Sequence, residues 1–443
     1  MQRLINSVDK YRELILNVHD FLWKHPETGY REWETSKYLE QQYEKLGYKL
    51  VRAENIPGFY TDIDTGIPGP KLLILGELDA LLCPEHPDAN PETGAAHCCG
   101  HSAQSAALLG IAAALSEASA LDGLCGSIRL CAVPAEELIE IEYRNKLLNE
   151  GVIKYFCGKS EFLRRGYFDG VDMAFMVHTS QGKGFATEKG AVGCIAKRIA
   201  YKGVSAHAGG NPWDGCNALY AATQGLSAIN AIRETFREKD IVRVHPIITQ
   251  GGGAVNAIPN FVKVESYVRA SSYEAINAAN EKVNRALCGA ALSLGANVDI
   301  EDTMGYSPLK NDEGMIRLAR EAAEEVSDVP PWYSESIGSG STDMGDLSAI
   351  MPVVHPYAPG AAGTSHGKDY KIENPELACV QSAKYQLVML WKLLSKGGER
   401  AKEIIEAYIP VFESKEEFFE YVDGIKNAGD RIEYTKYGAT VRL

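Results

Sequence analysis

The sequence has no excess of positive charge, although the chain is long. Its 443 residues include 59 acidic and 45 basic side chains, which gives a formal net charge of −14. Nucleic-acid-binding proteins usually carry the opposite sign, so we expect no nucleic-acid partner. Ten cysteines scattered through so long a chain do not indicate a disulfide scaffold, and we expect most of them to be reduced and buried.

The sequence also lacks long hydrophobic segments. The N-terminus, MQRLINSVDKYRELILNVHDF, is interrupted by charges and has no apolar signal core. No stretch is long and apolar enough to span a bilayer. We therefore expect a cytoplasmic protein that does not contact a membrane.

Nucleotide-binding and serine-nucleophile motifs are absent as well. The glycine-rich segments GGGAVN and GSGSTDMGD do not continue as a phosphate-binding loop or a dinucleotide fingerprint. The serines of the second segment do not fit a nucleophile-elbow pattern. Other residue types must therefore carry the chemistry.

Apolar runs alternate with helical patterns in the first part of the chain. KLLILGELDA, GSIRLCAVPA and VDMAFMVH predict buried strands, and SAQSAALLGIAAAL predicts a helix made of small residues. Two further helices are expected before the first strand. This alternation predicts an α/β domain with a mostly parallel, mixed sheet that helices cover on both faces.

From about Gly184 the pattern changes to alternating polar and apolar residues. The order strand, helix, strand, strand, helix, strand predicts a compact α+β sandwich. We therefore expect a catalytic domain made of residues 1–185 and 306–443, into which an α+β lid of residues 186–305 is inserted. Residues 395–443 suggest charged helices without an assigned role.

Metal-capable side chains follow several of the predicted strands. In open parallel sheets, ligands bind beyond the carboxyl ends of the strands, so these segments could meet in one crevice. Thiolate, imidazole and carboxylate together suit zinc, manganese or cobalt. The segments are Glu77 to Asp79, Cys99 to His101, the pair Glu136 and Glu137, His178, and His366 in the loop GTSHGKDY.

Three of these signals also have a structural alternative. Cys99 and His101 could be a buried thiol beside a hydrogen-bonded histidine. Glu136 and Glu137 could start a solvated helix, where acids are favourable. His178 could be a structural histidine at a strand end.

Several ordered motifs resemble one family over nearly the whole chain, from His25 to about Leu394. They are HPETGYREWETSKYLEQQYEKLGY, GELDAL, HCCGH, PAEE, GVSAHAGGNPWDGCNAL and GGGAVNAIPNFVKVESYVRA. Together they resemble the M20 metallopeptidase and amidohydrolase family, in particular its aminoacylase-like branch with aminobenzoyl-glutamate hydrolases.

The resemblance implies a role for each matching residue. It implies a site for one or two divalent ions, manganese or zinc with cobalt as a further candidate, held by Cys99, His101, Glu137, His178 and His366. Glu136 matches the general base, and Asp79 matches the acid that orients a ligand or the base. The lid residues His207, Asn256 and Arg269 match groups that hold the substrate and polarise its carbonyl. In the family the lid also mediates dimerisation, which implies a homodimer.

Two positions depart from the branch. It usually has aspartate directly after Cys-Gly-His and often a second histidine soon afterwards, whereas this chain has Ser102 and Gln104. These changes put in question the hydrogen bonds that would orient the metal ligands, and with them the metal affinity. The loop from Leu82 to Ala96 is also long and could reshape the mouth of the pocket.

We expect a metal-dependent hydrolase that cleaves the amide bond of a small N-acyl amino acid, such as an acyl-glutamate. A divalent ion would activate water, and Glu136 would accept its proton. One alternative is a dipeptidase or aminopeptidase that requires a free amine. Another is a metal-binding homologue without turnover, which the retained Glu136 disfavours.

Overall fold

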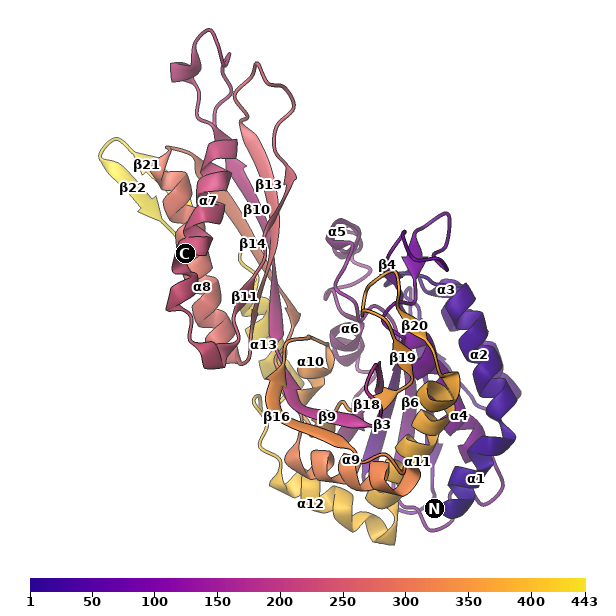
Figure 1. The fold of residues 1–443 in the computed structure, drawn as a ribbon. Helices are drawn as coiled ribbons and strands as arrows, with labels where there is room; N and C mark the ends of the chain where they lie inside the picture. Colours follow the sequence, from indigo (N-terminus) through magenta and orange to yellow (C-terminus); the bar gives the residue numbers. More distant parts are fainter. The chain divides into compact units, whose positions relative to one another are not determined.

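The computed structural model describes residues 1–443, which form two compact units (Figure 1). The first unit comprises Met1–Gly190, Lys310–Ile337 and Thr342–Lys415. The second comprises Ala191–Leu309, Gly338–Ser341 and Glu416–Leu443. The second unit thus interrupts the first along the chain. Residues 416–443, which we expected in the first unit, pack with the second.

A six-stranded sheet forms the centre of the first unit, in the order β1-β2-β6-β3-β7-β17. The β1–β2 and β2–β6 pairs are antiparallel, whereas β6, β3, β7 and β17 are parallel neighbours. Strand β3 is almost entirely buried, as expected for a parallel strand covered on both faces. The strands are β1 (Val51–Arg52), β2 (Phe59–Asp64), β3 (Lys71–Glu77), β6 (Ser127–Val133), β7 (Met173–Phe175) and β17 (Val353–Val354).

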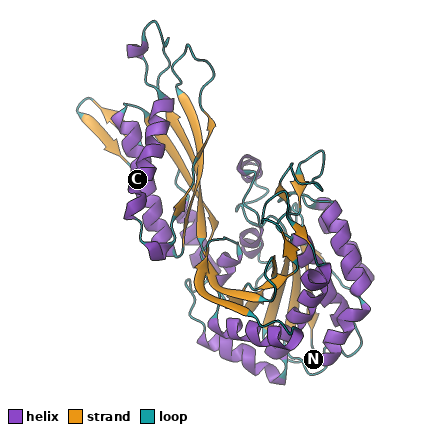
Figure 2. Ribbon diagram, viewed as in Figure 1, coloured by secondary structure: helices purple, strands orange, loops and turns teal.

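Helices cover both faces of this sheet (Figure 2). Helix α4 (His101–Leu115), buried along its whole length, packs on the face to which Leu72 and Ile74 contribute. Helix α6 (Gly158–Arg164) packs against β6 with α10 (Met344–Ser348) beside it. The other helices are α1 (Gln2–Lys10), α2 (Arg12–Lys24), α3 (Trp33–Lys45), α5 (Ile141–Asn149), α9 (Glu313–Val326), α11 (Ser382–Leu394) and α12 (Glu399–Ala407).

Small residues explain how α4 lies so close to the sheet. A Cβ atom at Gly76 of β3 would lie 3.2 Å from the side chain of Leu108, so a larger residue there would push the helix away. Helices α1, α2 and α11 pack over the outer side of α4 and complete the main hydrophobic core. The alanine-rich sequence therefore forms the central helix of a layered α/β unit.

Short strands form a second sheet at the side of the first unit, in the order β15-β9-β18-β8, with β16 paired to β9. Strand β18 pairs with β8 in parallel and brings Tyr357 beside His178. A π-helical segment, Glu376–Gln381, leads into α11. The strands here are β8 (His178–Ser180), β9 (Ala186–Ala191), β15 (Leu309–Lys310), β16 (Trp332–Gly338) and β18 (Tyr357–Pro359), and two hairpins pair β4 (Leu81–Leu82) with β5 (Ala95–Ala96) and β19 (Ala361–Ala362) with β20 (Lys371–Ile372).

The second unit is an antiparallel sheet with two helices on one face. Its strand order is β11-β13-β10-β14, and β12 also pairs with β13. Burial alternates along β13, as expected for a sheet with one covered face. The elements are β10 (Gly193–Lys202), α7 (Ala218–Ile232), β11 (Arg243–Val244), β12 (Ile247–Gln250), β13 (Phe261–Ala270), α8 (Tyr273–Ser293) and β14 (Asn297–Tyr306).

The C-terminal segment runs along the open edge of this sheet. Arg431 donates hydrogen bonds from its amide to the carbonyl of Val298 and from its guanidinium to the carbonyl of Ile300, both on β14. Tyr421 of α13 (Lys415–Ile425) hydrogen-bonds Asn277 of α8. The chain then ends in a hairpin of β21 (Ile432–Thr435) and β22 (Gly438–Val441) rather than in another helix. No helix of the structure combines the length and the apolar character needed to cross a membrane.

Candidate metal centre

Three parallel strands deliver the predicted site residues to one edge of the central sheet. Glu77 is the last residue of β3, and Glu136 and Glu137 follow the end of β6. His178 begins β8 shortly after β7 ends. Because β3, β6 and β7 are parallel, their carboxyl ends lie at the same edge. The chain thereby gathers acids and imidazoles that are far apart in sequence.

All five predicted metal ligands lie in one cluster at this edge. The Cys99 Sγ atom is 3.2 Å from His178 Nε2, and His366 Nε2 is 3.4 Å from Glu137 Oε1. Potential ligand atoms of Cys99, His101 and His178 all lie within 4.8 Å of one another, and so do those of Cys99, Glu137 and His366. The two groups share Cys99.

Unpartnered buried atoms in the cluster fit a bound cation. His101 Nε2 and Glu137 Oε1 are buried and have no hydrogen-bond partner. Such groups are costly in a protein interior unless an ion or water satisfies them. Burial lowers the pKa of His178 to about 4, which keeps its imidazole neutral and able to ligate. With thiolate and carboxylate, this donor set suits zinc, manganese or cobalt.

The backbone of the Cys-Gly-His loop depends on its glycine. Gly100 has a φ of +92°, in the left-handed region, and precedes the first turn of α4. A Cβ atom there would lie 2.3 Å from Thr179 Oγ1 and 2.4 Å from the Tyr370 hydroxyl. Glycine therefore allows Cys99 and His101 to face the same cluster.

Asp79 supports two residues of the cluster from below. Its Oδ1 atom is 3.1 Å from His101 Nδ1, and its Oδ2 atom accepts a 2.8 Å hydrogen bond from the Glu137 amide. The carboxylate is fully buried. A carboxylate on the second ring nitrogen of a histidine fixes the orientation of the ring and makes the first nitrogen a better ligand. This geometry agrees with the orienting role that the resemblance implies.

Glu136 lies beside the predicted ligands and is almost completely buried. Potential ligand atoms of His101, Glu136 and Glu137 lie within 4.8 Å of one another. Burial, together with the charges of Glu77 and Glu137, raises the pKa of Glu136 well above its ordinary value. A cation in the cluster would act in the opposite direction, because it favours the ionised form.

A buried ion cluster that the sequence does not predict lies next to Glu136. The ammonium of Lys159, on α6, is 2.6 Å from Glu77 Oε1 and also donates to Asp343, and none of the three side chains is exposed. Glu77 Oε2 in turn lies 3.3 Å from His101 Nε2. From the sequence, Glu77 is only a metal-capable residue at a strand end. No local pattern distinguishes Lys159 or Asp343 from surface charges.

His355 is another buried group that the sequence does not single out. It follows β17, and its ring centroid lies 5.9 Å from that of His178. Both of its ring nitrogens are buried without a hydrogen-bond partner, while its amide donates to the side chain of Asn311. Its position after a parallel strand is the signal that could have identified it.

The two departures from the branch are buried in the first turn of α4. The hydroxyl of Ser102 and both terminal atoms of the Gln104 side chain have no hydrogen-bond partner. Neither residue replaces a member of the ligand cluster. The cluster is therefore complete without an aspartate at position 102.

The predicted lid residues all lie in the second unit, which holds none of the predicted metal ligands. His207 is exposed, and its Nδ1 accepts hydrogen bonds from the amides of Gly209 and Gly210. Asn256 is exposed as well. Arg269, on β13, donates to the Ser341 hydroxyl. Their contacts with substrate stay predictions.

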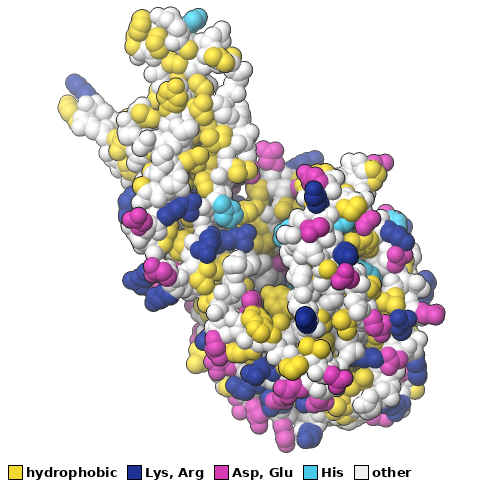
Figure 3. Space-filling model, viewed as in Figure 1, with side chains coloured by type: hydrophobic (Ala, Val, Ile, Leu, Met, Phe, Trp, Pro, Cys, Tyr) yellow, Lys and Arg dark blue, Asp and Glu magenta, His cyan; other side chains and the backbone are white.

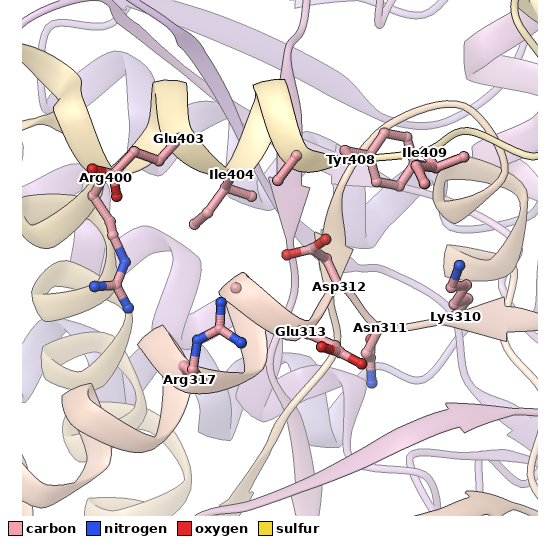
Figure 4. A pocket seen from close by; sticks show the side chains of 12 residues that line it. Lys310, Asn311, Asp312, Glu313, Arg317, Arg400, Glu403, Ile404, Tyr408 and Ile409 are labelled. Atoms are coloured by element: carbon pink, nitrogen blue, oxygen red, sulfur yellow. The ribbon is translucent and has the colours of Figure 1, made fainter.

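A separate pocket of about 370 Å³ lies in the first unit between the start of α9 and α12 (Figure 4). Its walls carry charges of both signs, among them Arg317, Glu313 and Glu403. None of the predicted site residues lines it. We therefore do not assign the chemistry to this pocket.

Comparison with known proteins adds to this geometry. The family model of peptidase family M20/M25/M40 matches residues 73–390, which include the whole ligand cluster. The chain belongs to this family. It is accordingly a hydrolase of the metallopeptidase and amidohydrolase type, as the motifs predicted.

Relatives within the M20 family differ in the substrates that their names state. The chain is 28% identical to the Xaa-Arg dipeptidase of Mus musculus over 372 residues, which cover 80% of this chain and 79% of that protein. It is 26% identical to a p-aminobenzoyl-glutamate hydrolase polypeptide of Escherichia coli (strain K12) over 342 residues, covering 75% of this chain and 66% of that protein. Both parts of the predicted resemblance, to the family and to aminobenzoyl-glutamate hydrolases, are thereby confirmed.

A solved structure shares the fold. The dinuclear metal-binding M20 peptidase from Bacillus subtilis superposes with a TM-score of 0.67 at 22% identity, covering 87% of this chain and 99% of that one. The predicted α/β fold class is therefore confirmed.

Proposed function

We propose that this M20 protein hydrolyses the amide bond of a small N-acyl amino acid, with Glu136 as the general base. The observation that carries the proposal is the convergence of Cys99, His101, Glu137, His178 and His366 beside Glu136. A binding protein without turnover would have no need for a buried carboxylate next to its metal ligands. The relative named for p-aminobenzoyl-glutamate, itself an N-acyl amino acid, supports this substrate class.

We propose that the five ligands hold two divalent ions, manganese or zinc. The groups Cys99, His101, His178 and Cys99, Glu137, His366 overlap only in Cys99, which supports a pair of ions better than a single one. Bound divalent ions lower the pKa of water and stabilise negative charge that develops on a carbonyl oxygen. Asp79 would hold His101 and the Glu137 backbone in place for them.

The protein's own groups carry the proton transfers in this proposal. The Glu136 carboxylate accepts a proton from the attacking water and then gives it to the nitrogen of the leaving amine. Arg269 and Asn256 would bind the substrate carboxylate, because a guanidinium matches the geometry of a carboxylate. His207 would donate a hydrogen bond to the oxygen of the cleaved carbonyl.

The test combines metal analysis with a screen of amide substrates. Purified protein is expected to contain manganese or zinc and to release free amino acids from N-acyl amino acids, p-aminobenzoyl-glutamate among them. Glu136→Gln should lower kcat/KM by about 10²–10⁴-fold while the ion content stays unchanged. Glu150→Gln, on an exposed residue at the end of α5, is the matched control. Normal turnover by Glu136→Gln would refute the assignment of the base.

A dipeptidase is the second candidate, and the relative named Xaa-Arg dipeptidase favours it. The two candidates differ in whether the substrate needs a free amine. Alanyl-arginine and N-acetyl-alanyl-arginine form a pair that differs only in this group. Cleavage of the first alone at the same peptide bond would favour the dipeptidase, whereas release of arginine from both would favour the acyl-amino-acid hydrolase.

We also propose that the second unit mediates a homodimer. Large apolar side chains on it are exposed to solvent, and Figure 3 shows part of this apolar surface. Large exposed apolar patches mark interaction sites in soluble proteins. The side chains are Val204, Trp213, Tyr220, Ile247 and Val255. Light scattering should give the mass of a dimer for the native chain and of a monomer for Trp213→Lys combined with Ile247→Asp.

The cytoplasm is the compartment that we propose. All ten cysteines are free thiols, and eight of them are buried. Thiols persist in reducing compartments. Thiol titration of unfolded protein, kept without reductant after rapid lysis, should find ten free thiols.

A further inference from the structure

Lys159 is fully buried in the first unit, and its ammonium contacts two acidic side chains. Its ammonium lies 2.6 Å from Glu77 Oε1 and donates a second hydrogen bond to Asp343 Oδ1. Its backbone amide donates a third, of 2.9 Å, to Asp343 Oδ2. A buried ammonium is stable only when acids and hydrogen bonds compensate it in this way.

The acids around Lys159 form a ligand set of their own. One carboxylate oxygen each of Glu77, Glu136 and Asp343 lies within 4.8 Å of the others, and all three residues are buried. Three carboxylates this close repel one another strongly in a low-dielectric interior. A cation or a proton relieves such repulsion, and hard divalent ions are the usual cations for oxygen ligands. In this protein Lys159 supplies that charge.

The start of α6 is built to bring Lys159 there. A Cβ atom at Gly158 would lie 1.7 Å from the carbonyl oxygen of Pro134, so only glycine allows the helix to begin directly against this segment. The Gly158 amide donates to the Ala135 carbonyl, one residue before Glu136. The backbone therefore fixes Lys159 next to the proposed base.

The same acids connect Lys159 to the proposed ligands. Glu77 contacts Lys159 with one oxygen and lies 3.3 Å from His101 Nε2 with the other, which has no hydrogen-bond partner. A divalent ion among Glu77, Glu136 and Asp343 would thus bind two carboxylates that lie directly beside the neighbouring cluster. The Lys159 ammonium differs from such an ion because it is covalently attached to the chain and cannot dissociate. It also cannot coordinate ligand atoms of the neighbouring cluster.

We propose that Lys159 acts as a permanent cation in a site formed by the carboxylates of Glu77, Glu136 and Asp343. Lys159 thereby confines divalent ions to the neighbouring cluster of predicted ligands, which consists of Cys99, His101, Glu137, His178 and His366. Lys159 is a positioning residue in this proposal, because it acts through the acids that it holds. Only the confinement of divalent ions to the five predicted ligands rests on the proposed function.

The proposal predicts that removal of a positive side chain adds a metal ion. Manganese is the suitable probe because it prefers carboxylate oxygens. After loading with Mn²⁺ and removal of free metal, Lys159→Ala should retain one more Mn²⁺ per chain than the native protein, by elemental analysis and electron paramagnetic resonance. Lys159→Arg, which keeps the charge, should retain the native number. Adding Asp343→Asn to Lys159→Ala should abolish the gain.

Lys197 provides a matched control in the second unit. It is the other fully buried lysine, but it is held by one carboxylate, Asp302, and by the amides of Asn280 and Asn284. Lys197→Ala should therefore gain no ion. A gain in this variant would show that any buried lysine cavity takes up Mn²⁺, and it would overturn the proposal.

Stability provides a second measurement in case Lys159→Ala folds poorly. An ion that binds only the folded state stabilises it by mass action. Mn²⁺ should therefore raise the melting temperature of Lys159→Ala more than that of the native protein. An unchanged ion count, or a variant that Mn²⁺ does not stabilise further, would overturn the inference. A native protein without bound ions would instead refute the proposed metal centre and leave the comparison between variants valid.

Discussion

The backbone amide of His366 donates a 2.9 Å hydrogen bond to the carbonyl of Cys98. This contact fastens the loop with the last predicted ligand to the loop with the first. His366 has a φ of 62°, in the left-handed region that non-glycine residues rarely adopt. Tertiary contacts thus hold the backbone there in an uncommon conformation and keep His366 beside the loop that carries Cys99.

Asp79→Asn should weaken metal binding without removing a ligand. The variant keeps the size of the side chain but loses the charge beside His101 Nδ1. Loss of such a supporting group typically lowers metal affinity about 10–100-fold. Competition with a chelator of known affinity would measure the change. Unaltered affinity would show that Asp79 serves the fold alone.

Gly100→Ala should cost more stability than the same change at Gly66. Both glycines have positive φ, but a Cβ atom at Gly66 has no neighbour within 4 Å, whereas one at Gly100 meets Thr179 and Tyr370. The left-handed backbone alone costs about 1–2 kcal/mol for alanine, and overpacking adds roughly 1–3 kcal/mol. Urea unfolding of the two variants measures the difference. Equal losses would mean that the loop moves freely to admit the methyl group.

The metal-free protein should lose stability as the pH falls from 6.5 to 4, in part through His19. Burial lowers the pKa of His19 to about 4, whereas the ordinary value is 6.5. The unfolded chain therefore binds more protons than the folded one in this window, and the free energy of unfolding decreases by up to about 1.4 kcal/mol per pH unit for this group.

Replacement of this histidine isolates its contribution. His19→Asn should reduce the pH slope of the unfolding free energy between pH 6.5 and 4 and leave the slope above pH 7 unchanged. Urea unfolding at several pH values provides the comparison. Identical slopes in the two proteins would contradict the buried, neutral state of His19.

Removal of residues 427–443 should destabilise the second unit and cause association. These residues supply the hydrogen bonds from Arg431 to Val298 and Ile300 along β14. An uncovered edge strand pairs readily with other chains. Chromatography and thermal unfolding would reveal both effects. Removal of residues 436–443 alone keeps the hydrogen bonds of Arg431 to Val298 and Ile300 and should have a much smaller effect.

The parts of the structure that sequence could predict are those with local or periodic signals. The buried strand that ends at Glu77 and the small-residue helix that begins at His101 are visible as apolar runs. The rule that parallel strands share an edge then brings Glu136 and His178 together. The strand and helix order of the second unit also follows from its alternation.

Other features depend on contacts that no local pattern encodes. Lys159 and Asp343 are separated in sequence by most of the second unit, and each alone resembles a solvated charge. The hairpin after Arg431 forms where the chain meets the β14 edge, although the charged sequence suggests a helix. The burial of these charges and the formation of the hairpin depend on which residues they contact in the fold, and residue type alone does not reveal those contacts.

The insertion also sets the order in which the cluster can form during translation. Cys99, His101, Glu137 and His178 precede Ala191–Leu309 of the second unit in the order of synthesis, and His366 follows that segment. A nascent chain in the interval carries a thiol and two imidazoles without their last ligand. The complete cluster of predicted ligands is therefore available only late in synthesis, after the interrupting segment has been made.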